Sequence, residues 1–384
     1  MHYRSFYNFF YKCLVGNFFY KRSSIIHILI LIYFLLPALG LSCSLDKRVC
    51  EWTDKVRIVL AGEITATSVV LNDTFFVTNK HVVEDNLTVK ILDSSGVFLN
   101  AYVIPNQHDS DLVLISLEKN PKISLDQIAT PAHFKNLRNV AYGIGRGEVR
   151  VFPEGRLIAY PPNNLSQARI HSTLRNLPGI SGGALINGDG ELVGIIAGGS
   201  GQYNEAIPIH VLNEVIKEIK STEKKFQERG TGIRLCSEML LDLESYEGIP
   251  GVILVDKLKM NCEIANNKTL FDMIGQYFGT IGLFQESNKY LRKSVALDPN
   301  SPTSLISFAI ALQYQRLYER QVEVLNHLLN FVEEDPLVLR MAIQAAAFSN
   351  NKVFAIKALK LIKKNNPYAY PQASDFLMKY FSSL

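Results

Sequence analysis

The chain has 384 residues, of which 47% are hydrophobic and 20% are charged. This composition is typical of a soluble globular protein with about two or three domains. The formal net charge is +4, but residues 1–40 contain four basic side chains and no acidic one, so the rest of the chain has no net charge. A neutral remainder excludes the broad basic surface that binds nucleic acid, and we expect no nucleic-acid partner.

Residues 1–42 have the pattern of a targeting segment. Basic side chains up to Arg22 precede an apolar run that begins at Ile25, and Ala-Leu-Gly at residues 38–40 is a small-x-small cleavage site. This order predicts a secretory signal peptide. An uncleaved membrane anchor is the alternative, because about 18 apolar residues can just cross a bilayer. In both cases the rest of the chain lies outside the cytoplasm (periplasmic, secreted or anchored), and only this segment contacts the membrane.

The cysteines fit an exported protein. Cys13 lies in the targeting segment, which leaves Cys43, Cys50, Cys236 and Cys262. An even number in an oxidising compartment permits disulfides, with Cys43–Cys50 and Cys236–Cys262 as the local pairing, and free buried thiols are the alternative. No Cys-x-x-Cys or His-Glu-x-x-His pattern occurs, so we expect no metal site and no cofactor.

Short apolar or alternating runs, separated by turn residues, fill residues 55–209 and predict many short β-strands. The runs span residues 56–60, 68–71, 74–78, 89–92, 100–104, 112–117, 140–144, 156–160, 167–172, 184–186 and 192–197. Strands of this length and spacing indicate an all-β sandwich or a pair of barrels. An amphipathic helix at residues 211–219 should close this domain, which we place at residues 43–220.

Three residues in this domain have the chemistry of a nucleophilic catalyst. Ser181 lies in a glycine-rich turn, His81 follows a strand, and Asp111 opens another strand. Each alone has an ordinary structural explanation, as a turn residue, a strand-end histidine and a cap. Together, the order His, Asp, Ser matches one of the known arrangements of the serine-nucleophile triad.

The segments around these residues resemble the motifs of one family. Residues 78–83 (Thr-Asn-Lys-His-Val-Val), 109–114 (Asp-Ser-Asp-Leu-Val-Leu) and 178–185 (Pro-Gly-Ile-Ser-Gly-Gly-Ala-Leu) resemble those of the chymotrypsin-fold serine proteases of the HtrA type, and the resemblance covers roughly residues 55–220. It implies a double β-barrel, protein or peptide substrates and a role in quality control or processing outside the cytoplasm. The chain differs from the family motif at Ile180, where a polar residue is usual, and at Ala184, where proline is usual.

Residue roles follow from this resemblance. Ser181 would be the nucleophile, His81 the general base and then the acid, and Asp111 the residue that orients the imidazole. The backbone N–H groups of Gly179 and Ser181 would form the oxyanion hole. Arg175, six residues before the serine, would lie near the base of the primary substrate pocket and favour an acidic side chain. A solvated loop arginine is the alternative interpretation of Arg175.

Residues 221–266 resist a simple assignment. Residues 221–229 have the polar, charged composition of a linker. The runs at 232–235 and 251–255 resemble two strands of the PDZ domain that often follows HtrA-type proteases. Because the segment has only about half the length of a PDZ domain, we interpret it as a linker or a remnant.

Residues 267–384 have the periodicity of helices. Gly275, Phe278, Gly282 and Pro299 lie at the offsets of a 34-residue tetratricopeptide-like repeat. Further repeats look degenerate, because Pro299, Pro336 and Pro367 are 37 and 31 residues apart. We expect stacked helical hairpins that present a surface to a substrate or a protein partner. A cap that stabilises the protease or its homo-oligomer is the alternative.

The sequence thus predicts a multidomain β + α protein, a chymotrypsin-like double barrel followed by a domain of α-helical hairpin repeats. The first functional hypothesis is an exported serine endopeptidase that acts through an acyl-enzyme. The second is a catalytically inactive scaffold or chaperone, in which Ile180 misaligns the oxyanion loop.

Overall fold

The computed structural model describes residues 43–381 except 144–146, 163, 201, 220–221, 247 and 249. The chain divides into two units, of which the second, residues 45–384, is compact. The predicted signal peptide or anchor at 1–42 lies outside the described residues. Among the helices that are described, none is long and apolar enough to span a bilayer.

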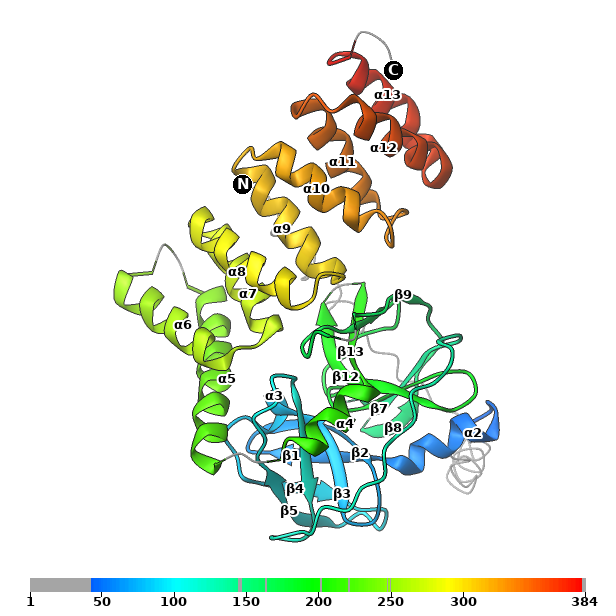
Figure 1. The fold of residues 1–384 in the computed structure, drawn as a ribbon, viewed down its shortest axis with the longest axis vertical. Helices are drawn as coiled ribbons and strands as arrows, with labels where there is room; N and C mark the ends of the chain where they lie inside the picture. Colours follow the sequence, from blue (N-terminus) through cyan, green and yellow to red (C-terminus); the bar gives the residue numbers. More distant parts are fainter. Residues whose placement is uncertain are drawn as a thin grey trace, which may run out of the picture. The chain divides into compact units, whose positions relative to one another are not determined.

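The second unit begins with a closed β-barrel (Figure 1). A short helix α2 (Lys47–Cys50) and a 3-10 turn η1 (Glu51–Lys55) lead into it. Six antiparallel strands close in the order β1-β2-β3-β6-β5-β4. They are β1 (Val56–Ala61), β2 (Ile64–Val70), β3 (Phe75–Asn79), β4 (Thr88–Leu92), β5 (Phe98–Ile104) and β6 (Leu112–Ser116), with the one-turn helix α3 (Lys80–Val83) after β3. Every residue of β3 and β6 is buried, so these two strands lie at the centre of the domain.

A seven-stranded sheet follows, in the order β8-β7-β11-β12-β13-β10-β9. Its strands are β7 (Arg138–Gly143), β8 (Glu148–Val151), β9 (Leu157–Ala159), β10 (Ile170–Ser172), β11 (Ala184–Ile186), β12 (Leu192–Ser200) and β13 (Tyr203–Pro208), and α4 (Ile209–Lys217) comes next. One apolar core joins barrel and sheet, since Val77 and Leu114 of the barrel cluster with Val140 and Ile195 of the sheet. The predicted chymotrypsin-like fold is confirmed, with the first barrel closed and the second half formed by this sheet.

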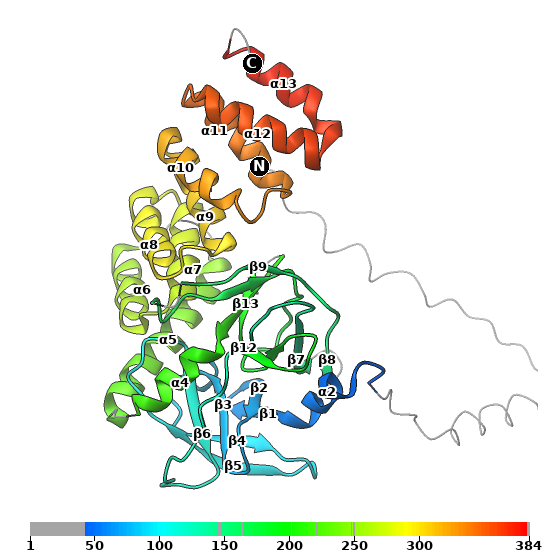
Figure 2. The ribbon, with the colours of Figure 1, turned by 45° about the vertical axis from the view of Figure 1, so that its right-hand side comes forward.

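The remaining described residues form helices, which are seen from a second direction in Figure 2. They are α5 (Glu223–Glu244), α6 (Val252–Ala265), α7 (Lys268–Thr280), α8 (Phe284–Leu297), α9 (Pro302–Tyr314), α10 (Tyr318–Leu328), α11 (Pro336–Phe348), α12 (Lys352–Asn365), η2 (Pro367–Ala369) and α13 (Tyr370–Met378). The predicted helical domain is therefore present, and it begins earlier in the chain than expected.

The interpretation of residues 221–266 as a linker or PDZ remnant is wrong, because this segment forms α5 and α6. Its glycines permit close helix packing and do not mark strand turns. A Cβ on Gly230 would collide with the carbonyl of Glu84 after α3, and one on Gly232 would collide with Ile264 of α6. Gly232, the first residue of one of the two runs that resembled strands, is thus a contact point of the long helix α5, and Gly251, the first residue of the other run, is the N-cap of α6.

The expectation of degenerate repeats is also wrong. The first helices of three successive hairpins begin at Lys268, Pro302 and Pro336, and the second helices at Phe284, Tyr318 and Lys352, so both series have a spacing of 34 residues. Side chains at the N-caps Asn267, Ser301 and Asp335 accept backbone hydrogen bonds at the same interval. This is the period of tetratricopeptide repeats, although the assignment to that family stays a prediction.

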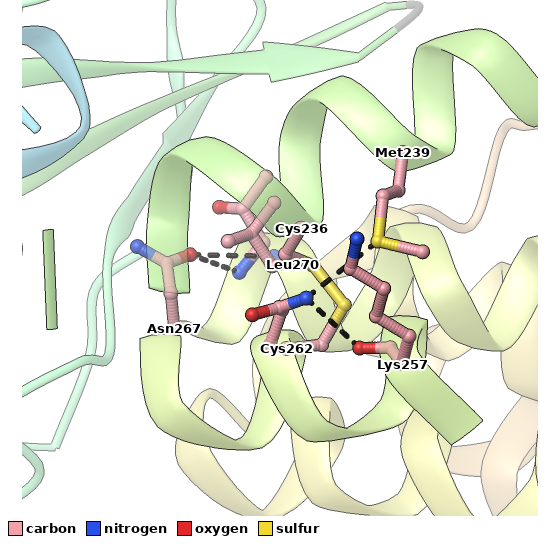
Figure 3. Close-up of a disulfide and its surroundings, with 8 residues drawn as sticks. Cys236, Met239, Lys257, Cys262, Asn267 and Leu270 are labelled. Carbon is pink, nitrogen blue, oxygen red and sulfur yellow. Dashed lines mark hydrogen bonds between the residues drawn. A yellow bond between two sulfur atoms is a disulfide. The ribbon is translucent and has the colours of Figure 1, made fainter. Parts of the chain in front are cut away.

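The first two of these helices, α5 and α6, are joined by a disulfide between Cys236 and Cys262 (Figure 3). Both cysteines are buried in a core that also contains Leu258 and Phe271. This pairing is one of the two local disulfides that the sequence suggested, and it is confirmed. It anchors the helical hairpin on which the repeats begin.

Candidate active site

Strand pairing brings His81 and Asp111 together. β3 pairs with β6, with Asn79 opposite Leu112, so the residues that follow one strand and precede the other become neighbours. The backbone N–H of His81 donates to Asp111 Oδ1 at 3.0 Å, and His81 Nδ1 lies 2.6 Å from Asp111 Oδ2. The carboxylate thus holds His81 through one contact to its backbone and one to its ring, and it leaves Nε2 available to another group.

Asp111 is a buried anion, with 5% of its side chain exposed. Burial alone would raise its pKa, but the charge and hydrogen bonds of His81, together with the nearby charge of Arg169, lower the pKa to about 2. The carboxylate is therefore ionised at any pH at which the imidazole could act as a base. Sequence reasoning missed Arg169, because a lone arginine in a strand-rich segment normally reads as solvent-exposed.

Thr67 of β2 fixes the loop that carries Ser181. Its backbone N–H donates to the carbonyl of Ser181 at 2.9 Å, and its hydroxyl donates to the carbonyl of Gly179 at 2.6 Å. The Thr67 carbonyl in turn accepts from the hydroxyl of Thr78, three residues before His81. A Cβ on Gly182 would collide with both threonines, so the serine loop packs directly against the strands that lead to His81.

The serine turn has the features of an oxyanion site. Gly179 has φ +89°, in the region that favours glycine. Among the residues of the described structure, the N–H groups of Gly179 and Ser181 donate to no protein acceptor. Ile180, the departure from the family motif, is 1% exposed and packs in a core with Leu185 and Ile196. Its side chain therefore anchors the turn from within.

The structure joins two of the three predicted catalytic residues by a hydrogen bond. Within the described part of the chain, no hydrogen bond links the Ser181 hydroxyl to His81. Such contacts are often long in ligand-free enzymes and shorten when substrate binds, so this geometry does not exclude a triad. Ser181 is half-buried, and the His81 side chain is 32% exposed, which leaves both accessible from solvent.

Arg175 is exposed, as either interpretation of it requires. It lines a cavity of about 430 Å³ together with Tyr203 of β13 and Asp335, the N-cap of α11. None of His81, Asp111 and Ser181 lines this cavity. A role for Arg175 in substrate selection stays a prediction.

One group of side chains outside this site has the composition of a cation site. His133, Asp189 and Glu191 place ligand atoms within 4.8 Å of one another. His133 Nε2 already lies 2.6 Å from Asp189 Oδ2, and Glu191 accepts from Asn187 at 2.7 Å. Protein groups thus occupy these ligand atoms, and we assign no metal to them.

Lys80, next to His81, is only 2% exposed. Its ammonium group donates to the carbonyl of His108, which also accepts from Arg229 of α5 at 3.1 Å. Burial first, and then the charge of Arg229, lower the pKa of Lys80 to about 7, although Asp111 and Asp109 partly oppose this. Sequence reasoning missed this residue as well, since lysines are rarely buried.

Lys80 makes stability depend on pH. Between pH 7 and 10.5 the unfolded chain binds a proton that the folded chain lacks, so the free energy of unfolding should rise with pH, by at most about 1.4 kcal/mol per unit. Lys80→Met should remove this rise and be more stable than the wild type at pH 6. Denaturant unfolding at several pH values measures both effects, with the exposed Lys90→Met as control. An unchanged slope in Lys80→Met would contradict the assignment.

Thr67 gives a second prediction. Thr67→Val keeps the shape of the side chain but leaves the Gly179 carbonyl and the Tyr142 N–H without the hydroxyl that they contact. It should lower the free energy of unfolding by about 1–3 kcal/mol. Thr67→Ser keeps the hydroxyl and loses one buried methyl, a cost of about 0.8 kcal/mol. Urea unfolding should therefore give a lower free energy of unfolding for Thr67→Val than for Thr67→Ser. If burial of apolar surface alone decided stability, the order of the two variants would be reversed.

Comparison with known proteins agrees with this geometry. Residues 66–195 match the model of the trypsin-like peptidase domain. The chain is 28% identical to a serine protease HtrA-like protein of Staphylococcus haemolyticus over 240 residues, which cover 54% of this chain and 37% of that protein. It is 29% identical to a probable periplasmic serine endoprotease DegP-like of Pseudomonas fulva over 178 residues, 41% of this chain and 34% of that protein.

Among solved structures, the protease from Mycobacterium tuberculosis in its active form is similar, with 18% identity and a TM-score of 0.38, over 46% of this chain and 86% of that one. The chain spans between a third and two fifths of the length of the two curated relatives described above. The family model, the curated relatives and the fold agree on the peptidase region. The peptidase region of the chain, residues 66–195, is therefore similar to the trypsin-like peptidase domain, and its curated relatives are HtrA-type serine proteases.

Proposed function

We propose that the chain is an exported serine endopeptidase that cleaves peptide bonds through an acyl-enzyme on Ser181. The observation that carries the proposal is the His81–Asp111 pair, held by two hydrogen bonds at the end of β3. The strands that position this pair also anchor the serine loop through Thr67 and Thr78. A general base and a nucleophile are thus built on one rigid support.

In the proposed reaction, Ser181 Oγ attacks the carbonyl carbon of the scissile bond while His81 Nε2 takes its proton. The developing oxyanion accepts hydrogen bonds from the N–H groups of Gly179 and Ser181, which donate to no acceptor in the described residues. His81 then gives the proton to the leaving amine, and water hydrolyses the ester by the reverse sequence. Asp111 stabilises the imidazolium throughout and does not itself become protonated.

Export is supported by two observations. The Cys236–Cys262 disulfide fits an oxidising compartment, since cytosolic thiols are normally kept reduced. A relative from Pseudomonas fulva has a name that places it in the periplasm. We therefore propose that the peptidase domain lies outside the cytoplasm, and that its boundary with the helical domain falls between α4 and α5.

The proposed activity is tested with a fluorophosphonate probe, which labels an activated serine. The wild type should be labelled, and Ser181→Ala should not. Asp111→Asn, which keeps the size of the side chain, should lower the rate of labelling by about 10⁴-fold because it stabilises the wrong imidazole tautomer. Absence of serine-dependent labelling under every condition, including added activating peptides, would instead favour the inactive scaffold.

We further propose that the helical repeats recruit the substrate as an extended peptide segment with an apolar side chain. A cavity of about 430 Å³ on α7, α8 and α9 is lined by Phe284, Leu291 and Tyr314. Phe284 and Tyr314 stack with ring centroids 5.8 Å apart, and Tyr314 is 69% exposed. An exposed aromatic pair beside an apolar cavity is the kind of anchor that dominates peptide binding.

Tyr314→Ala should lower kcat/KM for an unfolded protein such as casein about fivefold or more, the effect of losing one anchor worth over 1 kcal/mol. Hydrolysis of a small ester, which reaches only the active site, should not change. Tyr368→Ala serves as the control, since Tyr368 is 94% exposed and lies outside this cavity. Equal effects of the two variants on casein would refute recruitment through this surface.

A further inference from the structure

A line of buried charges connects Asp111 to the helical repeats. Arg169 Nη2 lies 3.6 Å from Asp111 Oδ2, and Arg169 Nη1 lies 3.6 Å from Glu205 Oε2 in β13. Glu205 Oε1 accepts from the ammonium group of Lys268 at 2.6 Å. All four side chains are at most 5% exposed, and Lys268 is the first residue of α7.

The line continues inside the repeats. Lys268 Nζ lies 3.7 Å from Asp298 Oδ2, at the end of α8, and donates to the hydroxyl of Ser301 at 3.1 Å. Asp298 in turn contacts His171 Nε2 of β10 at 2.9 Å. Asp298, Ser301 and His171 have no exposed surface. The first repeat and the second β-sheet therefore share one buried ionic cluster.

The chemistry of the proposed triad explains why Asp111 needs a buried cation besides His81. A general base must be neutral before it can accept a proton, so at any pH at which His81 is a base it stabilises the buried Asp111 through hydrogen bonds but no longer through a positive charge. Arg169 can supply that charge. When His81 later becomes an imidazolium, Asp111 can pair with it, because Arg169 still has Glu205 as a second carboxylate partner. The imidazolium and the guanidinium therefore do not compete for Asp111 alone.

We propose that Arg169 is a positioning residue for Asp111, and that Lys268 of the first helical repeat holds Arg169 in place through Glu205. This inference rests on the proposed function. It makes the helical domain a part of the active-site support as well as a recruiting surface. The peptidase fold alone would contain Arg169 and Glu205 but would lack the cation that balances Glu205.

Other charged groups face the same residues. Lys80 and Arg229 also act on Asp111 from α3 and α5. Glu205 also faces His171 and Asp272, and burial raises the pKa of Asp272 to about 6. These groups keep their positions in variants of Arg169 or Lys268, so a change in the pH profile of such variants reports the loss of the substituted charge.

The test compares Arg169→Met and Lys268→Met with the wild type in the full-length chain, using hydrolysis of a small ester. Each should lower kcat by about tenfold to a hundredfold, the range for residues that orient a metal-bound histidine, which we apply to the support of His81. KM should change little. The acid limb of the pH–rate profile should move to higher pH, because the uncompensated anions favour the protonated imidazole. Lys268→Arg keeps the charge and should retain most of the activity.

Misfolding is separated from mispositioning by a triple variant, Arg169→Met with Glu205→Leu and Lys268→Met. The triple variant removes three adjoining charges together and leaves Asp111 with His81 and Asp298 with His171. Removing one member of a buried ionic group leaves its partner uncompensated, so the triple variant should melt closer to the wild-type temperature than either single variant and still have the lowered kcat and shifted pH profile. Wild-type kcat and pH profile in a folded triple variant would overturn the proposal.

A ¹H NMR spectrum tests the positioning role of Arg169 without any measurement of turnover. The His81 Nδ1 proton, donated to a carboxylate at 2.6 Å, should give a strongly downfield ¹H NMR signal that His81→Ala abolishes. Arg169→Met and the triple variant should shift or broaden this signal. A normal signal without serine labelling in the wild type would refute the proposed activity alone. An unmoved signal in both Arg169 variants would refute the positioning role alone.

Discussion

A carboxylate with 5% exposure must be stabilised by its neighbours, because taking a charge out of water costs several kcal/mol unless other groups replace the solvent. Asp111 meets this requirement with a backbone N–H, an imidazole and a guanidinium. The first two belong to His81 in α3, and the third belongs to Arg169 in the loop before β10. The pairing of β3 with β6 and the docking of the second sheet on the barrel are both needed to place them.

The same requirement explains why charged residues extend so far into the interior. Arg169 compensates the buried charge of Asp111 but is itself a buried cation, and it pairs with Glu205. Glu205 is a further buried anion, and it pairs with Lys268. The series ends only where Asp298 and His171 meet between the sheet and the repeats. The burial of Asp111 is therefore linked, through these ion pairs, to the charged side chains at the interface between the second sheet and the helical repeats.

The sequence was sufficient to predict the barrel, the association of His81 with Asp111 and the glycine turn, because each depends on local pattern: alternating strands, short motifs and positive φ at Gly179 and Gly182. It was insufficient for Arg169, Glu205 and Lys268, whose pairing joins residues about 36 and 63 positions apart and leaves no local trace. The run 232–235, which begins with Gly232, was misread as a strand for a related reason. A glycine in a helix and a glycine before a strand look alike until the neighbouring backbone is known.

The period of the repeats was hidden by the choice of marker. Pro299, Pro336 and Pro367 do not lie at equivalent positions of the repeats; the equivalent positions are the N-caps Asn267, Ser301 and Asp335, which differ in residue type and share only a side-chain acceptor. An interval of 34 residues between Asn, Ser and Asp, each at a helix start, was available in the sequence as a signal. It becomes persuasive once the helix starts are known.

These three positions also face the peptidase. Lys268, after Asn267, donates its backbone N–H to Gln167; Asn300, before Ser301, donates to the Tyr160 carbonyl; and Asp335 accepts from the Tyr203 hydroxyl. A stack of repeats normally has only nearest-neighbour contacts and can fray from one end, repeat by repeat. Here each successive repeat is tied, at the start of its first helix, to β13 or to the segment between β9 and β10 of the peptidase domain. The stack thereby loses the independence of its units, and its unfolding becomes cooperative with that of the peptidase.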